Sequence, residues 1–287
     1  MARPLRIELA GAVYHVSVRG AFGRSVFADE HDRHMLLELL GRTMHRFDAQ
    51  VLAYNLLTDH FHLLLFTRQA NLSRLMRHLN GCYTQYFNRR HGDGGRLFQG
   101  RFKAIVVDRE ALLLDACRYV ELNALRLGLV REVADWPWSS FPAHAGLVPA
   151  PEWLELDGLY RFVLGRAADS VTERRRAAER YAKLVASESG LLLWPGQLRQ
   201  QIFLGNADFA ARMRLLAMGD PQARTLRLRR KPMPWSEWRR SSSSREQALY
   251  LAHTVGGLSM TALADTLGLS ISRISRLIAG YERAAPS

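Results

Sequence analysis

Two histidines flank a single phenylalanine in the sequence His60-Phe61-His62. On a β-strand, residues two apart point to the same face, so both imidazoles project together while Phe61 faces the other way. Neutral imidazole is a good ligand for divalent metals. The pair therefore predicts a metal site. A histidine in a strand is more often structural, so the pair alone does not decide between the two roles.

A second feature is the pair Tyr119 and Asn123, which lie four residues apart in a segment with helical periodicity. Residues at this spacing share one face of a helix. For the tyrosine alone, a half-buried place at the border of the apolar stripe is the ordinary role. The asparagine is less expected, because it is unfavourable inside a helix. Its carbonyl oxygen could complete a metal site begun by His60 and His62.

A third feature is the basic and aromatic stretch GRLFQGRFKA at residues 95–104. Charged side chains can follow a phosphate backbone while aromatic rings stack on unpaired bases. The expected nucleic-acid contacts in this stretch are Arg96, Phe98, Arg101 and Lys103. The alternative is an edge strand with a basic face.

The whole chain is basic. Its 287 residues include 40 Lys and Arg against 27 Asp and Glu, a formal net charge of +13. Such an excess favours a polyanionic partner, through neutralisation of phosphates and release of counterions. Much of it lies between residues 222 and 245, where Arg229, Arg230 and Lys231 are candidate DNA contacts. No membrane partner is expected, because no apolar run reaches the roughly 18 residues of a membrane helix.

The elements that must hold these residues follow from the hydrophobic pattern. Strands are expected at residues 13–19, 50–57, 60–67 and 102–107, with helices after Asp29, after Asn71 and over residues 109–123. The resulting order is βαββαβα. A four-stranded antiparallel sheet with helices packed on one face accounts for it, as in ferredoxin-like α+β domains. The fold class is therefore α+β, followed by a mostly helical C-terminal region.

Four segments are expected along the chain: a first domain at 1–148, a helical extension at 149–219, a basic linker or arm at 220–244, and a helix-turn-helix-like DNA-binding domain at 245–287. In the last segment, two short helices lie on either side of the turn Gly268-Leu269-Ser270, and the second helix is basic. This pattern is typical of a helix-turn-helix. Arg273 and Arg276 are the candidates for the DNA groove. The alternative is a helical cap with no role in DNA binding.

Five stretches in one order carry a resemblance to a known family. They are ARPLRIELAGAVYHVSVRG, DHFHLLL, GGRLFQGRFKA, RYVELNALRLGLV and WPWSSFPAHAG, which together span residues 2–146. In combination they resemble the REP-associated tyrosine transposases, a bacterial branch of the single-tyrosine HUH nucleases in the insertion-sequence-200-like family. The chain departs from the pattern at Asp59, where relatives often have Asn, and at Ala124, where they often have Pro.

The resemblance implies roles for the residues above. His60 and His62 match the His-hydrophobic-His metal motif, Tyr119 matches the nucleophile, and Asn123 falls at the third metal ligand. Glu121 ranks below Asn123 for that role. The implied cofactor is Mg²⁺ or Mn²⁺, with no nucleotide cofactor. The implied reaction is metal-dependent cleavage of single-stranded or hairpin DNA through a 5′-phosphotyrosine intermediate and strand transfer, with REP-like palindromes as targets.

The expected location is the bacterial cytoplasm, in association with the nucleoid, and a monomer is expected. Three other functions stay open. The first is a non-catalytic hairpin-DNA-binding regulator derived from a transposase. The second is a metal hydrolase acting on small molecules, which would need more ligands at zinc-like spacing. The third is an RNA-binding protein.

Overall fold

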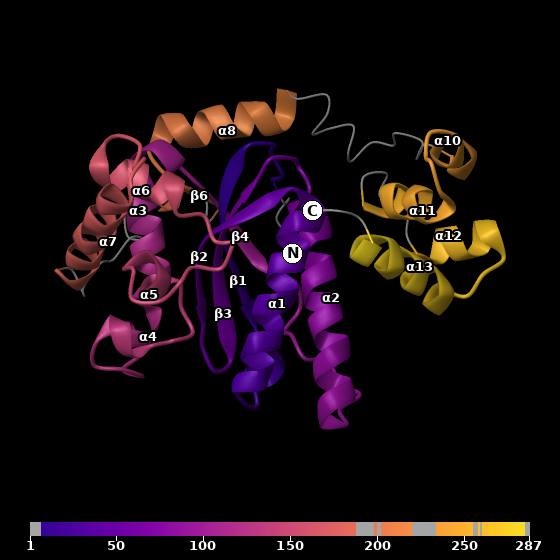
Figure 1. Ribbon diagram of the computed structural model, residues 1–287, viewed down its shortest axis with the longest axis horizontal. Helices are drawn as coiled ribbons and strands as arrows, with labels where there is room; N and C mark the ends of the chain where they lie inside the picture. The colour runs from indigo at the N-terminus through magenta and orange to yellow at the C-terminus, as the bar shows by residue number, and fades with distance from the viewer. Residues whose placement is uncertain are drawn as a thin grey trace. The chain divides into compact units, whose positions relative to one another are not determined.

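Strands and helices alternate through the first half of the chain in the predicted order (Figure 1). The elements are β1 (Ala12–Arg19), α1 (Glu30–Phe47), β2 (Ala49–Leu56), β3 (His60–Thr67), α2 (Leu72–His91), β4 (Lys103–Val107) and α3 (Arg109–Glu121). This computed structural model describes residues 7–187, 198–199, 202–219, 234–254, 258 and 260–284. The chain divides into two compact units, Met1–Ala217 and Met218–Ser287. None of the described helices is long and apolar enough to span a membrane.

The sheet of the first unit has the strand order β2-β3-β1-β4-β6-β5. Its first four strands pair antiparallel, as the sequence predicted. Two short strands extend it: β6 (Phe203–Leu204) lies parallel to β4, and β5 (Leu198–Arg199) lies antiparallel to β6. The expected sheet of four antiparallel strands is therefore wrong in strand number and in direction at one edge. Two-residue strands are too short to show an alternating pattern.

Helices cover both faces of the sheet, not one as the sequence predicted. Tyr14 and Val16 of β1 pack in one cluster with α1 and α2, whereas Val13 packs with α3 in another. The reason is visible in β3, where Leu64 is as fully buried as its two neighbours. A strand whose successive side chains are all buried must be covered on both faces.

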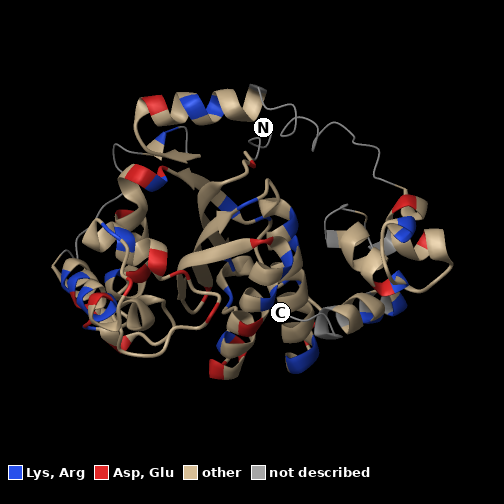
Figure 2. Ribbon diagram, turned by 45° about the horizontal axis from the view of Figure 1, so that its top comes forward, with Lys and Arg blue, Asp and Glu red and all other residues tan. Residues whose placement is uncertain are grey.

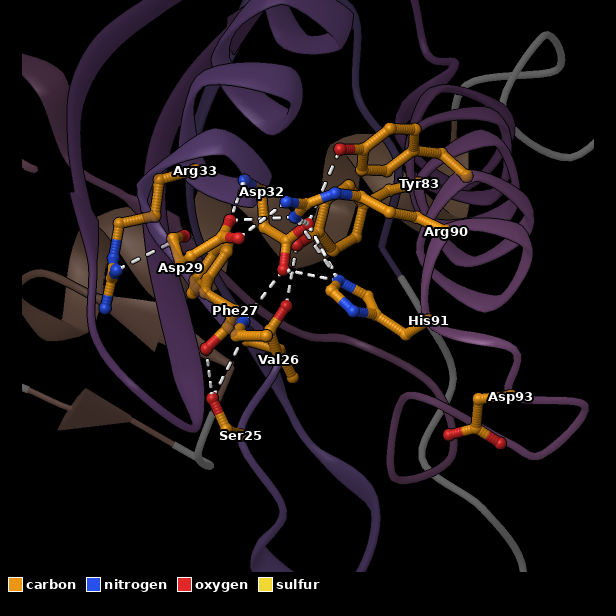
Figure 3. Close-up of polar contacts among 12 residues, drawn as sticks. Ser25, Val26, Phe27, Asp29, Asp32, Arg33, Tyr83, Arg90, His91 and Asp93 are labelled. Carbon is orange, nitrogen blue, oxygen red and sulfur yellow. Dashed lines mark hydrogen bonds and ion pairs between the residues drawn. The ribbon is translucent and has the colours of Figure 1, made fainter.

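A buried carboxylate joins the start of α1 to the end of α2 (Figure 3). Asp32 is fully buried, and it accepts hydrogen bonds from the Ala28 N–H at 2.8 Å, from Arg90 at 2.5 Å and from His91 at 2.9 Å. Burial acts to raise the pKa of Asp32, but these hydrogen bonds outweigh it and lower the pKa. The carboxyl of Asp29 accepts from the Asp32 N–H, as expected for the residue before a helix.

The rest of the first unit is mostly helical, and part of it packs against α3. It contains the short helices η1 (Ala21–Gly23), α4 (Asn123–Arg126), η2 (Val133–Asp135) and α5 (Phe141–His144), and the helices α6 (Asp157–Leu164), α7 (Val171–Ala186) and α8 (Ala207–Gly219). Leu159 of α6 and Tyr181 and Val185 of α7 belong to the same buried cluster as Leu113 and Val120 of α3. The predicted extension is thus mostly helical where described.

The second unit has a small core of its own. Its helices are α10 (Trp235–Arg240), α11 (Arg245–Thr254), α12 (Met260–Leu267) and α13 (Ile271–Ala284). Leu249, Leu263 and Ile274 are among its buried residues. Gly268 has a φ of +63°, which suits a tight turn between α12 and α13. Helices α12 and α13 lie on either side of this turn, as predicted. In contrast, α10 lies within residues 220–244, where a linker or arm was predicted, and Trp235 and Trp238 pack against the core of this unit.

Candidate active site

Three histidines and a tyrosine meet on the α3 face of the sheet. The predicted pair His60 and His62 lies on β3, with ring centroids 5.1 Å apart. A third histidine, His15 of β1, stacks on His62 with ring centroids 5.0 Å apart and planes 13° apart. Tyr119 of α3 meets His15 edge-on at 5.8 Å. His15, which the sequence pattern did not single out, thus contacts both the predicted nucleophile Tyr119 and the predicted metal ligand His62.

The Nδ1 atoms of both predicted ligands are already engaged. His60 Nδ1 lies 2.5 Å from Asp59 Oδ1, and His62 Nδ1 lies 2.9 Å from His15 Nε2. Neither Nε2 atom has a hydrogen-bond partner among the described residues, so both remain as donors to a metal. Partners of this kind fix the tautomer and orientation of ligating histidines. Asp59 also accepts from Arg19 at 3.0 Å. The donor set therefore fits a divalent cation.

Burial and nearby positive charge favour the neutral imidazoles of His15 and His62. Burial, and then the charge of Arg126, lower the pKa of His15 to about 4. Burial also lowers the pKa of His62 well below its usual value, with further contributions from His15, His60 and Arg126. A neutral imidazole is the form that binds a metal. Both residues are therefore neutral at pH 7.

Arg126 places a positive charge beside Tyr119. Its guanidinium carbon lies 4.0 Å from the centre of the tyrosine ring, and the guanidinium donates to the Tyr119 carbonyl. Burial lowers the pKa of Arg126, and the interaction with Tyr119 acts to raise it. A guanidinium over an aromatic face is a favourable arrangement. It also lies where negative charge would develop if the phenol lost its proton.

Asn123 is held on the turn of helix that carries Tyr119. Its Nδ2 donates to the carbonyls of Tyr119 at 3.1 Å and Val120 at 3.2 Å. This leaves the oxygen Oδ1 as the atom suited to a cation. The described contacts include none between Asn123 and His60 or His62, and no group of three or more His, Cys, Asp or Glu side chains there could hold a metal. The role of third ligand therefore stays a prediction.

Glu121 faces away from this site into the core between α3, α5 and α7. Its buried carboxylate accepts from Ser140 Oγ at 2.6 Å, His144 Nδ1 at 2.6 Å and the Tyr181 hydroxyl at 2.7 Å. Three donors satisfy a carboxylate that burial would otherwise destabilise. Its place below Asn123 as a candidate ligand agrees with this geometry.

Asn55 fixes the end of α3 over the histidines. It lies opposite His62 in the pairing of β2 with β3, and its Nδ2 donates to the carbonyls of Val120 and Glu121, each at 3.0 Å. Carbonyls at the end of a helix lack partners within it, so a side-chain amide there stabilises the end. The strand that neighbours His62 is thereby joined to the helix that carries the nucleophile.

The predicted DNA contacts are only partly at the surface. Arg96, Arg101 and Lys103 are exposed. Phe98 is only 8% exposed, and the centre of its ring lies 6.0 Å from that of Phe61 and 6.2 Å from that of Tyr83. The predicted stacking of a base on Phe98 is therefore wrong, because its ring belongs to the core. The sequence misled here because an aromatic residue among arginines has the same pattern whether its ring points outward or inward.

In the second unit, Arg273 and Arg276 are exposed on α13, whose basic positions are blue in Figure 2. Ile274 and Ile278, four residues apart on the same helix, are buried. The helix therefore has an apolar inner face and exposed arginines outside it. The candidates Arg229, Arg230 and Lys231 lie outside the described residues.

Comparison with known proteins finds a family that resembles the part of the chain that holds this site. Residues 9–123 match the model of the family described as "Transposase IS200 like". A solved structure of a REP-associated tyrosine transposase bound to a REP hairpin is 19% identical, with a TM-score of 0.44 over 54% of this chain and 94% of that one. No curated protein matches the chain. The family match includes His15, His60, His62, Tyr119 and Asn123. Over residues 9–123, this chain is similar to the IS200-like transposase family.

Proposed function

We propose that this protein is a DNA transposase and endonuclease that cuts single-stranded or hairpin DNA and retains the 5′ phosphate on Tyr119. The observation that carries this proposal is the contact of Tyr119 with His15, which in turn is bonded to His62. In a region similar to the IS200-like family, a tyrosine whose ring contacts the histidine that is bonded to His62 supports phosphoryl transfer to tyrosine.

The step balances as a substitution at phosphorus. The Tyr119 hydroxyl oxygen forms a bond to phosphorus, the bond from phosphorus to the 3′ oxygen breaks, and that oxygen leaves as a 3′-OH with a proton. The phenol proton passes to a base such as water. The positive charge of Arg126 favours the attacking oxygen. Attack by a 3′-OH on the phosphotyrosine reverses the step, so strand transfer needs no nucleotide cofactor.

His60 and His62 would hold a divalent cation through Nε2, with the Asn123 oxygen as the proposed third ligand. Mn²⁺ or Mg²⁺ is proposed, and imidazole ligands favour Mn²⁺. When bound, such an ion polarises a phosphate oxygen. Asp59 would orient the imidazole of His60 through its Nδ1 atom, and His15 would orient that of His62 in the same way. The carboxylate at Asp59 therefore serves as a hydrogen-bond acceptor for a ligand.

The proposed substrate is a hairpin of the REP type with a single-stranded flank. The similar solved transposase is bound to such a hairpin, and the net charge of +13 favours a nucleic acid. Exposed Arg96, Arg101 and Lys103 would follow the backbone near the site. The second unit would act as a helix-turn-helix through Arg273 and Arg276. Action as a monomer at the bacterial nucleoid is part of the proposal.

The test is a labelled hairpin with a single-stranded flank, incubated with protein and Mn²⁺. The wild type is expected to give a phosphotyrosyl adduct that survives denaturation. Tyr119→Phe keeps the ring but lacks the nucleophilic oxygen, so it should give no adduct while still binding the hairpin. Tyr86→Phe removes a hydroxyl from α2, away from the site, and is the matched control.

An adduct that persists in Tyr119→Phe would remove Tyr119 from its role. Binding without any adduct in the wild type would instead favour the non-catalytic regulator. Comparison of DNA and RNA hairpins at several salt concentrations separates the DNA enzyme from an RNA-binding protein.

A further inference from the structure

The most exposed large apolar side chain among the described residues is Phe22, at 99%. Its backbone is in the left-handed region, with φ 54° and ψ 29°. A bulky residue rarely adopts this conformation. The fold therefore tolerates two unfavourable features at one residue, a strained backbone and an aromatic ring in water. Outliers of this kind justify a hypothesis of function.

Two glycines shape the turn that presents this ring. A side chain at Gly20 would place its Cβ 2.1 Å from the Arg24 carbonyl oxygen, and Gly23 has a φ of +73°. The Gly20 N–H donates to the Asp59 carbonyl at 2.7 Å, and the Ala21 N–H donates to the Leu97 carbonyl at 2.8 Å. The turn is therefore attached on one side to the residue before His60, and on the other to the basic stretch at 95–104.

The chain after the turn is equally well held (Figure 3). Arg24 pairs with Asp93 at 2.5 Å. The Val26 N–H donates to the Thr58 carbonyl at 3.0 Å, and the Val26 carbonyl accepts from the buried Tyr83 hydroxyl at 2.6 Å. Phe22 is thus an exposed ring on a fixed support. A preorganised ring loses little conformational entropy when it binds a partner.

Arginines lie on both sides of the turn, where Arg19 pairs with Asp59 and Arg24 with Asp93, and more follow in the stretch at 95–104. Arg19 has a side chain 65% exposed and precedes the turn. Its carbonyl accepts from the Gln99 N–H at 2.7 Å, which aligns it with the stretch that carries the exposed Arg96 and Arg101. The other exposed large apolar residues described belong to different segments. A single ring among arginines suits a nucleic acid better than a protein partner, whose contact would need a contiguous apolar patch.

We infer that Phe22 is a stacking platform for an unpaired DNA base beside the cleavage site, while Arg96 and Arg101 contact the flanking phosphates. This inference rests on the proposed function, because it requires a DNA substrate. A base in single-stranded DNA offers a free aromatic face, whereas a base inside a duplex does not. The ring therefore selects the single-stranded flank, and it does so without reading its sequence. Phe22 thus has the base-stacking role that the sequence predicts for Phe98.

The experiment measures affinity by fluorescence anisotropy for two DNAs, a hairpin with a single-stranded flank and the same hairpin with a blunt end. Phe22→Ala should weaken binding of the flanked hairpin about tenfold, within the range for loss of one base–aromatic stack. Phe22→Trp should retain the affinity, and blunt-hairpin binding should not change in either variant. Val171→Ala removes another highly exposed apolar side chain, 85% exposed, and is the control.

Two further readouts separate stacking from charge and from folding. Phe22→Ala should leave the slope of log affinity against log salt unchanged, whereas Arg101→Ala should reduce it by about 1. Phe22→Gly relieves the positive φ, so its melting temperature should not fall while its affinity falls like that of Phe22→Ala.

Equal affinity of Phe22→Ala and wild type for the flanked hairpin overturns the inference. A Phe22→Ala loss that is the same for blunt and flanked DNA overturns it as well, as does a change in oligomeric state without a change in DNA affinity. If the wild type forms the Tyr119 adduct in any of these cases, the proposed function stands and only the platform fails. If the wild type binds neither DNA, both fail.

Discussion

His15 lies between Tyr119, the proposed nucleophile, and His62, a proposed metal ligand. It contacts Tyr119 with its ring and His62 with its Nε2. Because the Nδ1 of His62 is engaged there, the Nε2 of His62 is presented for a metal. On the proposed function, His15 would be a positioning residue that orients a metal ligand without binding the ion itself.

Replacement of His15 should therefore weaken metal use more than DNA binding. We expect His15→Ala to lose about 10- to 100-fold in cleavage at low Mn²⁺, the range typical of partners that orient metal ligands, and to recover in part at high Mn²⁺. His15→Gln should retain more activity, because its amide oxygen can still accept from His62. The measurement is the cleavage rate over a Mn²⁺ titration, with His45→Ala, an exposed histidine of α1, as the control.

An unchanged Mn²⁺ dependence in His15→Ala would contradict the positioning role. Cleavage by the wild type that is unaffected by EDTA would contradict the metal site as a whole.

At this scale the sequence predicted the site unevenly. His60, His62 and Tyr119 have recognisable spacing, and a family pattern distinguished them from ordinary core residues. The sequence could also have indicated His15, because it alternates with the buried Tyr14 and Val16 and so lies on the opposite face of β1. A lone histidine in a strand, however, is usually structural. No sequence pattern indicated Phe22, since its exposure depends on a turn closed by contacts with distant segments.

Among the elements, the junction of α1 and α2 depends on one buried carboxylate. The stabilisation from Asp32 follows from its lowered pKa. It is present above the pKa of the unfolded state, about 3.9, and it is lost as pH falls below that value. Arg90 and His91 would lose their buried acceptor if the carboxylate were removed.

Asp32→Asn should therefore lower the free energy of unfolding at pH 7 by about 2 kcal/mol, the scale of a hydrogen bond to a charged group. The difference from wild type should shrink as pH falls below about 4, because the carboxyl of the unfolded chain then takes up a proton while the native carboxyl, with its lowered pKa, does not until the pH falls further. Urea unfolding at several pH values measures both effects.

The matched control is Asp48→Asn at the other end of α1. Its pair with Arg68 is exposed, and such pairs contribute little. Asparagine also suits the φ of 49° at this position. Equal destabilisation by the two changes, or a loss in Asp32→Asn that does not depend on pH, would contradict the account of this junction.

Periodicity predicted the elements well where they are long, and poorly where they are short. The first four strands and the first three helices have clear patterns, and their order already restricts the sheet to few topologies. The strands β5 and β6 are too short for any pattern. The second covered face was missed because the polar residues His15, Ser17 and His62 made that face look solvated, although α3 covers it.

For the whole molecule, the uneven charge is the feature that most directly predicts a partner. The second unit exposes Arg273 and Arg276 on one side of α13. If this helix enters a DNA groove, each arginine neutralises a phosphate or binds a base edge. If the unit is only a helical cap, neither residue affects DNA.

Arg273→Ala and Arg276→Ala should each weaken hairpin binding, and a phosphate contact should reduce the slope of log affinity against log salt by about 1. Adduct formation on a short single strand should not change, because the reacting groups lie in the first unit. Arg175→Ala, from an exposed pair with Glu179, is the control. Unchanged salt slopes and affinities in both variants would assign the second unit no part in DNA binding.

Residues 140–187 limit how far this chain can be shortened without loss of its fold. The match to the transposase family ends at residue 123, yet the three donors to Glu121 come from Ser140, His144 and Tyr181. Excision of the matched region alone would leave a buried anion without donors and expose the apolar side of the nucleophile helix. We therefore expect the helix that carries Tyr119 to depend on these later segments for folding, so that a deletion that removes Ser140, His144 or Tyr181 would destabilise α3.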